Sequence, residues 1–491
     1  MNARWLALLG AGGAVLVLLA IGNAAGYRYG VADQAFYIPS IQRAVTPSLF
    51  PRDTLLLDAQ SRLMVTDEIA AWVVVSSGVA LPSLMLAGYV GSLGMMFTAA
   101  WLVMRRLARS PWTAAAGCLA LTLRHRITKT GANSFEGYFH PRVAAFACGV
   151  SACAALAHGR LAVAWGLVAL SVVLHPTTGL WWVIWLGAAT WVVKPRWRRA
   201  VTGAVVAVAA VAIAALAVGP LAGRLVVMDA AWLQPFATKD YVFPTDWSVG
   251  SWLVNLLLPA VVVAVWHRRR HLGLAAPWEA GAVAGVVVLV AAFLLSLPLI
   301  AADVALAVQL QTSRVFWIVD LFAVLGAVWL LAEGVPRSRP LAVALILLLA
   351  SSSRAVYSVR VEHPERRVIE ADLVDGPWRD VGAWLATHTP PSTHVLADPD
   401  HDWKFGHSVR LTALRDVLVE GVKDAAVSLY DRQVAVRVQE RLEAIGDFGV
   451  LDAPGALALA RRFDLDVLVI DRDLPLPELY RNARFRVYRL R

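Results

Sequence analysis

The sequence predicts an α-helical polytopic membrane protein with about eleven transmembrane helices and a small C-terminal extracytoplasmic α/β domain. Of its 491 residues, 58% are hydrophobic and only 16% are charged, whereas soluble domains are about 25% charged. The mean hydropathy is +0.61. Apolar runs of about 20 residues recur along the chain, as bilayer-spanning helices require. A water-soluble fold is therefore excluded for most of the chain.

The excess of positive charge lies in loops and not on one surface. The formal net charge is +10, and the basic residues form short clusters near positions 105–109, 158–160, 194–199, 267–271 and 337–339. Nucleic-acid binding needs basic residues that share an exposed face, so we expect no nucleic-acid partner. Loops rich in Lys and Arg stay in the cytoplasm under the positive-inside rule. These five clusters are therefore expected on the cytoplasmic side.

Hydropathy and loop charge together define the expected spans. Their bounds are 5–25, 82–104, 111–124, 142–157, 161–174, 178–193, 200–220, 249–266, 277–299, 313–332 and 339–357. The N-terminus is then cytoplasmic. The outside carries the loops 26–67, 125–141, 221–248 and 300–312, together with everything after residue 358. We expect a multi-pass protein of a bacterial cell membrane, because scarce Lys beside abundant Arg and Ala is typical of high-GC bacteria.

Some segments depart from a simple series of spans. Residues 5–25 fit a cleavable signal peptide or a retained first helix, and we expect the helix because the topology then stays consistent. Segments 142–157 and 161–174 are short, as half-helices or tilted helices inside a bundle are. Loop 125–141 brings basic residues to the translocated side. This departure from the positive-inside rule requires a separate cause.

The composition changes after Arg360, where acidic residues become frequent. We therefore divide the chain into a transmembrane domain over 1–358, with outer loop 26–67, and an extracytoplasmic α/β domain over 359–491. Within the second domain, residue periodicity predicts helices over 377–388 and 432–445 and strands over 393–397, 466–470 and 485–490. No glycine-rich phosphate loop occurs there.

Several kinds of chemistry find no support in the sequence. The cysteines Cys118, Cys148 and Cys153 lie in apolar stretches, so we expect buried thiols and neither a disulfide framework nor a zinc site. The sequence contains no Walker loop, HExxH motif or nucleophile elbow. No row of acids within the expected spans resembles a proton relay. No metal ligands are assigned.

The segment after the first helix carries the most informative acidic residue. Residues 30–39 read Gly-Val-Ala-Asp-Gln-Ala-Phe-Tyr-Ile-Pro, with the acid at Asp33. A carboxylate at the outer mouth of a bundle can accept a proton from an acceptor hydroxyl, or hold a metal or an ammonium group. Alternatively, Asp33 caps a short surface helix.

With this segment, the chain resembles the GT-C membrane glycosyltransferases, a group that includes protein O-mannosyltransferases, the aminoarabinose transferase and oligosaccharyltransferases. The layout is similar: a cytoplasmic N-terminus, a long first outer loop with an acid, helices of uneven length and a C-terminal extracytoplasmic domain. Gly30, Asp33 and Tyr37 loosely match a Gly-Asp-Glu-x-x-Tyr stretch of that family. The resemblance implies a polyprenyl-phosphate-linked sugar as donor, a catalytic role for Asp33 and a substrate contact for Tyr37. Gln34 replaces a frequent second acid, so a divalent metal lacks that ligand.

A second candidate group lies where loop 125–141 meets the next span. It comprises Glu136, His140 and Arg142, and His175 ends the next span that rises to the same side. Cationic and imidazole groups at a membrane surface suit a lipid phosphate or pyrophosphate. Alternatively, Arg142 snorkels to the interface and His175 bonds to backbone at a helix end. The stretch from Pro-Arg to His-Pro is also similar to GT-C-like membrane proteins of unassigned activity.

The third candidate group precedes the tenth span. Gln309, Gln311 and Arg314 lie there, and Asp320 follows two turns later. An Arg at the start of an apolar helix can hold a lipid-linked phosphate, but Asp303 or Asp320 could equally be its ion-pair partner.

The loop from Trp232 to Trp247 mixes aromatic with polar groups, as a sugar-binding surface does. We include Gln234 of this loop as a candidate substrate contact. An interfacial aromatic belt explains the same Trp residues without a ligand.

Two functions from different classes remain. The first is an enzyme that transfers a sugar from a polyprenyl-phosphate donor to an acceptor on the outer face, with Asp33 as base and Arg142 or Arg314 on the donor phosphate. The second is a non-catalytic membrane protein, either a transporter of a lipid-linked glycan or a scaffold whose outer domain binds a partner. We favour the enzyme, because the spans lack the deep acids that ion-coupled transport uses.

Overall fold

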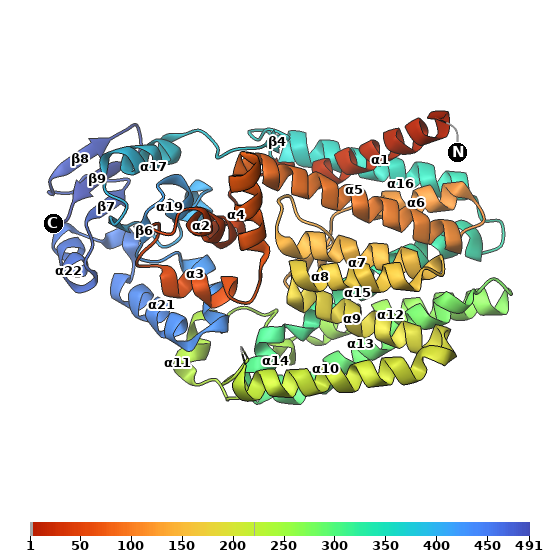
Figure 1. Cartoon of the computed structure of the whole chain (residues 1–491). Helices are drawn as coiled ribbons and strands as arrows, with labels where there is room; N and C mark the ends of the chain where they lie inside the picture. Colours follow the sequence, from red (N-terminus) through yellow and green to blue (C-terminus); the bar gives the residue numbers. More distant parts are fainter. Residues whose placement is uncertain (1–2, 220) are drawn as a thin grey trace.

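A computed structural model of the chain describes residues 3–219 and 221–491. Figure 1 shows a bundle of long helices at one end and a smaller mixed α/β region at the other. All eleven expected spans are helical, and residue 220, the last of one of them, lies outside the described residues. These helices are α1 (Ala3–Asn23), α5 (Leu81–Leu107), α6 (Pro111–Leu121), α7 (Pro141–Ala157), α8 (Leu161–Leu174), α9 (Pro176–Val193), α10 (Arg198–Val218), α12 (Val249–His271), α13 (Pro277–Ala301), α15 (Val315–Trp329) and α16 (Pro340–Tyr357).

Six helices in the described part of the chain are long and apolar enough to cross a membrane. Their ranges, which include adjoining turns, are Leu81–Leu107, Pro195–Val218, Val249–His271, Pro277–Ala301, Ala305–Gly334 and Pro340–Glu362. The structure thus supports fewer full spans than the eleven expected. The α8 helix has 14 residues, which make about 21 Å at 1.5 Å per residue, less than the ~30 Å of a bilayer core.

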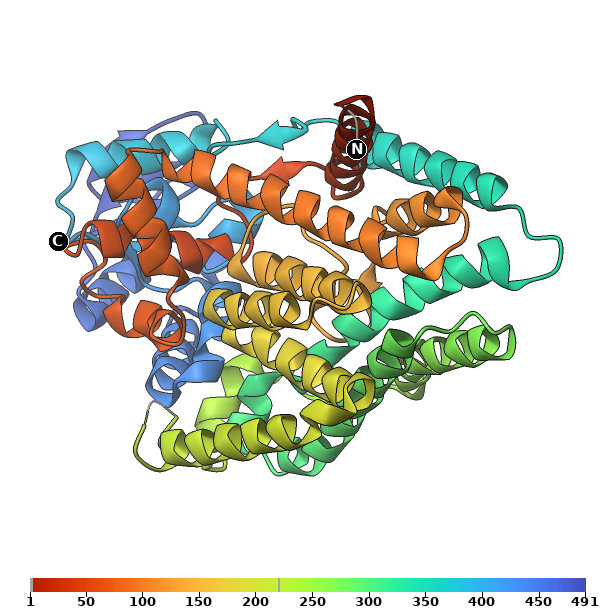
Figure 2. The same ribbon diagram turned by 45° about the vertical axis from the view of Figure 1, so that its right-hand side comes forward.

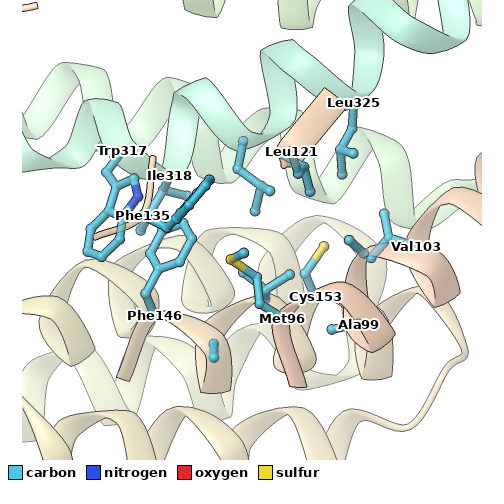
Figure 3. Close-up of a cluster of buried hydrophobic side chains, with 14 of the residues drawn as sticks. Met96, Ala99, Val103, Leu121, Phe135, Phe146, Cys153, Trp317, Ile318 and Leu325 are labelled. Carbon is cyan, nitrogen blue, oxygen red and sulfur yellow. The ribbon is translucent and has the colours of Figure 1, made fainter. Parts of the chain in front are cut away.

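The short helix α7 runs through the centre of the bundle. It packs against α5, α8 and α9, and a Cβ on its Gly149 would lie 1.9 Å from the Trp182 ring. The α7 side chains join a continuous apolar core, in which Phe146 stacks on Trp317 with ring centroids 3.9 Å apart (Figure 3). Cys153 belongs to the same core. It is a free buried thiol, as are Cys118 and Cys148, as expected.

The C-terminal region forms a five-stranded sheet with the order β6-β5-β7-β9-β8, parallel in its first three strands and antiparallel in the rest. The strands are β5 (His394–Leu396), β6 (Asp416–Val417), β7 (Val467–Ile470), β8 (Glu478–Arg481) and β9 (Arg486–Arg489). The helices are α17 (Pro377–His388), α18 (His401–Phe405), α19 (Val409–Thr412), α20 (Gly421–Val427), α21 (Arg432–Ile445) and α22 (Ala453–Phe463). The two helices and three strands expected here are present.

The first loop folds onto this C-terminal region. Its helices are α2 (Gln34–Val45), α3 (Thr54–Ser61) and α4 (Thr66–Ser77), and its strand β1 (Tyr27–Arg28) pairs in parallel with β4 (Ile369–Glu370). Phe36, Leu56 and Met64 share one apolar core with Leu418 and Val434. Figure 1 shows these red and orange helices against the blue C-terminal elements. Two segments far apart in sequence therefore build one body.

The remaining loops expected outside gather at the same end. Trp232 Nε1 donates to the Ser428 carbonyl at 3.0 Å, and Gln309 Nε2 donates to the Leu429 carbonyl at 3.1 Å. The basic cluster 267–271 lies at the other end, where Arg269 bonds to the Leu107 carbonyl (Figure 2). The short elements of these loops are β2 (Arg126–Ile127), β3 (Ala132–Asn133), α11 (Ala230–Leu233), η2 (Gln234–Phe236), η3 (Pro244–Asp246), α14 (Ala305–Leu310) and η4 (Thr312–Arg314), and they meet η7 (Ser428–Tyr430) of the C-terminal region. We call this loop-bearing end the mouth of the bundle.

Candidate functional site

Asp33 lies at the mouth and does not act as a helix cap. It occupies the N-cap position of α2, but its side chain makes no capping hydrogen bond. Instead, Lys423 Nζ of α20 donates to Asp33 Oδ1 at 3.1 Å. Burial alone would raise the pKa of the Asp33 carboxyl, but the positive charges of Lys423 and Arg142 hold it below its usual range. The carboxylate therefore stays ionised at neutral pH.

Gln34 connects α2 to the loop before α7. Its Oε1 accepts from the Gly30 N–H at 2.6 Å, and its Nε2 donates to the Phe139 carbonyl at 2.7 Å. A carboxylate could accept the first bond but could not donate the second. These two bonds explain why an amide, and not a carboxylate, occupies position 34.

His140 and Arg142 meet at the start of α7. Arg142 Nη2 lies 3.4 Å from His140 Nε2. A guanidinium only donates, so Nε2 accepts and the imidazole proton is on Nδ1. Burial and the Arg142 charge lower the pKa of His140 well below its usual value, so the ring is neutral. The Nδ1 atom is buried and has no hydrogen-bond partner among the described residues.

Arg142 is only 6% exposed and lacks a close carboxylate. Glu136 Oε1 lies 3.9 Å from its Nη2, and the other oxygen of this carboxylate is bound by Arg124 at 3.2 Å. The Arg142 guanidinium lies 5.9 Å from the centre of the Trp317 ring, which is within the range of a cation–π contact. Its Nε is buried and unpartnered in the described structure.

Arg314 is the second arginine at the mouth. Asp320, one of its two expected partners, is bound by His125 at 3.0 Å, and no ion pair of Arg314 with Asp303 or any other carboxylate occurs among the described residues. Arg314 Nε is buried without a hydrogen-bond partner there. Arg314 lies one helical turn before Trp317, the ring that Arg142 contacts. Both arginines therefore lie near the start of α15.

The C-terminal region covers this cluster. Besides Lys423, it contributes Tyr430, whose hydroxyl accepts from Gln311 Nε2 at 3.2 Å. Tyr241 lies beneath Arg314, 5.9 Å from its guanidinium, and burial raises the pKa of its hydroxyl to about 12. The mouth thus combines two arginines that lack close carboxylates with neutral hydroxyl groups.

The remaining sequence candidates are Tyr37, His175 and Gln234. Tyr37 belongs to the cluster, because its ring stacks parallel to His140 with centroids 6.3 Å apart. His175 ends a helix beside the cluster: its Nδ1 accepts from the Thr178 N–H at 3.3 Å, and burial with the charges of Arg142 and Arg314 lowers its pKa to about 3. Gln234 lies apart from the cluster, exposed on η2, and bonds to Glu443 at 3.3 Å.

An apolar groove begins at this cluster. It has a volume of about 160 Å³ and runs between α2, α4, α5 and the start of α7. Tyr37 and His140 form the end nearest to the arginines. The remaining lining residues are mainly apolar: Ile41, Thr66, Asp67, Ile69, Ala70, Val73, Leu84, Met85, Gly88, Phe139, Pro141 and Leu174. The positively charged cluster therefore adjoins an apolar groove.

No protein-family model matches this chain, and neither does any curated protein.

A metal site does not emerge from the described residues. No group of three or more His, Cys, Asp or Glu side chains lies close enough there to hold an ion. The positively charged mouth suits an anion instead, because three buried N–H groups of His140, Arg142 and Arg314 lack acceptors.

Sequence reasoning missed Lys423, Tyr430 and Asp67. Lys423 and Tyr430 reach the mouth through long-range folding, and neither belongs to a motif. Asp67 had a local signal, since it is an acid in the first turn of an apolar helix.

Proposed function

We propose that this protein is a GT-C-type membrane glycosyltransferase, which transfers a sugar from a polyprenyl-phosphate donor to an acceptor on the outer face of the membrane. One observation carries the proposal: His140 Nδ1, Arg142 Nε and Arg314 Nε are buried donors without acceptors in the described structure. Each such group costs about 1–3 kcal/mol when it is left unpaired. A phosphate offers oxygens that accept all three bonds, and its charge neutralises the arginines.

The apolar groove supports a lipid-linked donor over a soluble one. It starts at His140 and is lined mostly by aliphatic side chains of α4 and α5. A polyprenyl chain in this groove would place its phosphate beside Arg142. A free sugar phosphate would leave the groove without a function.

The transfer step assigns a role to each group. The acceptor oxygen forms a bond to the anomeric carbon, and the bond from that carbon to the phosphate oxygen breaks. The phosphate keeps the electron pair, and Arg142 and Arg314 stabilise the added negative charge. Asp33 orients the acceptor hydroxyl and takes up its proton, and Lys423 holds this carboxylate in position at 3.1 Å.

The distribution of charge supports the proposed orientation. Lys129 of loop 125–141 is bound to Asp240 at 2.5 Å, and Arg124 and His125 of the same region also have carboxylate partners. The basic cluster at 267–271 lies at the opposite end of the bundle. We accordingly propose that the mouth and the C-terminal domain face outward. The alternative, a non-catalytic transporter or scaffold, needs no carboxylate near the anion site.

Binding measurements with purified variants test the donor site. Arg142→Ala and Arg314→Ala should each weaken binding of a polyprenyl phosphate by about tenfold or more, because a hydrogen bond to a charged group contributes about 1.5–3 kcal/mol. Arg126→Ala is the matched control, since Arg126 is an exposed arginine of the same loop. Equal affinity in all four proteins would contradict the proposal.

A further inference from the structure

Asp67 is a buried acid in the wall of the apolar groove. It is the second residue of α4, is 6% exposed and lines the groove. Its Oδ1 is buried and has no hydrogen-bond partner among the described residues. Neither the phosphate site nor the transfer step described above uses this residue.

The groups around Asp67 do not neutralise it. Glu68, its neighbour on α4, adds a like charge, and burial together with Glu68 raises the pKa of Asp67 to about 7. The bases nearest in α2 and α3 are occupied, because Arg43 is bound to Asp58 and Arg62 is bound to Asp431.

The other groove walls bring no counter-charge either. The facing part of α5, Leu84 to Gly88, carries no ionisable group. Tyr37 of α2 and the neutral ring of His140 complete the groove's titratable groups. An ionised Asp67 would thus face a largely apolar channel.

The outer surface of α4 connects the groove to lipid. Ile69, Trp72 and Val75 of this helix are strongly exposed, and α4 lies beside the start of α5 where the bundle meets the C-terminal region (Figure 1). Exposed aromatic and aliphatic side chains of this kind mark a helix that rests in a membrane interface. A lipid chain can therefore reach the groove from the bilayer.

We infer that the groove between α2, α4 and α5 receives the hydrocarbon chain of a lipid, and that Asp67 admits this chain only as the neutral acid. The evidence for a lipid chain in the groove is the lining of the groove itself, whereas the identity of the lipid head group depends on the proposed function. A chain removes the last water from an unpaired carboxyl, and an ionised carboxylate is far costlier to bury than a neutral one. Loading the groove is thus coupled to uptake of one proton.

The sign of the pH effect follows from this coupling. Below the pKa of the empty state, Asp67 is already neutral and the chain binds without a proton cost. Above it, each pH unit weakens binding, until the pKa of the loaded state is reached. Affinity should therefore fall about tenfold between pH 6 and pH 8. A purely structural role, in which Asp67 only complements the N-terminal dipole of α4, predicts no such slope.

An uncharged probe tests the groove independently of the phosphate site. The protein in nanodiscs is labelled with a diazirine derivative of a fifteen-carbon isoprenoid alcohol over pH 5.5–8.5, and labelled peptides are mapped. Labelling at Met85 or Ile41 should fall about tenfold between pH 6 and pH 8 in the wild type. Asp67→Asn should label at the level of the acidic wild type at every pH.

Control variants distinguish the effect of Asp67 from the presence of the groove and from misfolding. Glu68→Gln should keep a pH-dependent fall in labelling but move it to lower pH, because Glu68 does not line the groove yet helps to raise the pKa of Asp67. Ala70→Trp should abolish the labelling by filling the groove. The inference is wrong if wild-type labelling is independent of pH, if the slope persists in Asp67→Asn, or if the groove residues are not labelled.

Competition by a polyprenyl phosphate distinguishes this inference from the proposed function. If the phosphate displaces the alcohol better from the wild type than from Arg142→Ala, both hold. If labelling by the alcohol shows the Asp67-dependent slope but the phosphate displaces the alcohol equally well from the wild type and from Arg142→Ala, the proposed donor is wrong. The inferred role of Asp67 then still holds. If displacement by the phosphate depends on Arg142 but labelling by the alcohol does not depend on pH, only the inferred role of Asp67 is wrong.

Discussion

Two buried arginines, one in the C-terminal domain and one at the mouth of the bundle, have opposite surroundings. In the C-terminal domain, Arg410 is fully buried and bonds to Asp53 at 2.8 Å and to Asp424 at 2.8 and 3.0 Å, with Glu420 at 3.3 Å. At the mouth, Arg142 has its nearest carboxylate oxygen at 3.9 Å. The first charge is satisfied by the fold itself. The second keeps a buried Nε that has no hydrogen-bond partner among the described residues.

This difference separates structural from functional charge. Removing one partner from a buried, fully paired ion group costs about 3–5 kcal/mol, because the remaining charges lose their compensation. An arginine such as Arg142, whose one carboxylate contact is long, is expected to contribute less to stability, and charges of this kind cluster at functional sites. The two regions are nevertheless connected, because α20 carries both Asp424, which binds Arg410, and Lys423, which binds Asp33.

The largest expected effect concerns stability. Arg410→Met should lower the free energy of unfolding of the C-terminal region by about 3–5 kcal/mol, because the buried Asp424 and Glu420 lose this counter-charge and Asp53 keeps only Arg437. Arg142→Met should change the same quantity by less than about 1 kcal/mol, since little compensation is lost. Denaturant titration in detergent, followed by hydrogen exchange of the two regions, measures both. Equal losses of unfolding free energy in the two variants would show that the two arginines contribute equally to stability.

The next effect concerns turnover. Asp33→Asn keeps the shape of the side chain but removes its proton-accepting charge, so sugar transfer should fall about 100-fold or more. Release of polyprenyl phosphate from a panel of polyprenyl-phosphate sugars, in membranes that contain the variant, measures this rate. Asp58→Asn is the control, because Asp58 is a partly exposed acid of the same loop, paired with Arg43. Normal release by Asp33→Asn would show that this acid is dispensable.

The smallest effect is a shift in pH dependence. Lys423 helps to keep the pKa of Asp33 low, so Lys423→Met should raise that pKa and move the acid limb of the turnover profile upward by about 1–2 pH units. Activity is present above the pKa of Asp33 and lost as the pH falls through it. Lys404→Met, which removes an exposed lysine paired with Asp398, should leave the limb in place. An unshifted limb in Lys423→Met would separate the lysine from the acid.

The helices were predictable because their signals are local. Apolar runs bounded by Pro, Gly or basic clusters located α5, α13 and α16 to within a few residues. Of the eleven expected spans, six are long and apolar enough to cross a membrane in the described part of the chain, because apolar composition also marks shorter helices such as α7 that are buried within protein. Hydropathy measures the preference for an apolar surrounding but does not tell protein from lipid.

The site was predictable only in part, for a related reason. His140, Arg142 and Arg314 stood out because positive charge next to apolar spans is costly and needs a cause. Lys423 could not be found this way, because a lysine in a soluble domain is unremarkable until the fold brings it 3.1 Å from Asp33. Gln234 stays a prediction: an aromatic-rich loop suggested a ligand there, and in the structure its side chain bonds to Glu443 at the surface.

The core shared by the first loop and the C-terminal domain imposes an order on biogenesis. Phe36, Leu56 and Met64 emerge early, but their packing partners, such as Leu418 and Val434, are made last. At about 5–20 residues per second, roughly 20–70 seconds separate the two events. During this interval α2 and α3 expose apolar faces and Asp33 has no Lys423. A nascent chain therefore cannot complete this core before its final hundred residues have been made, and its early loop is a natural client for chaperones during that time.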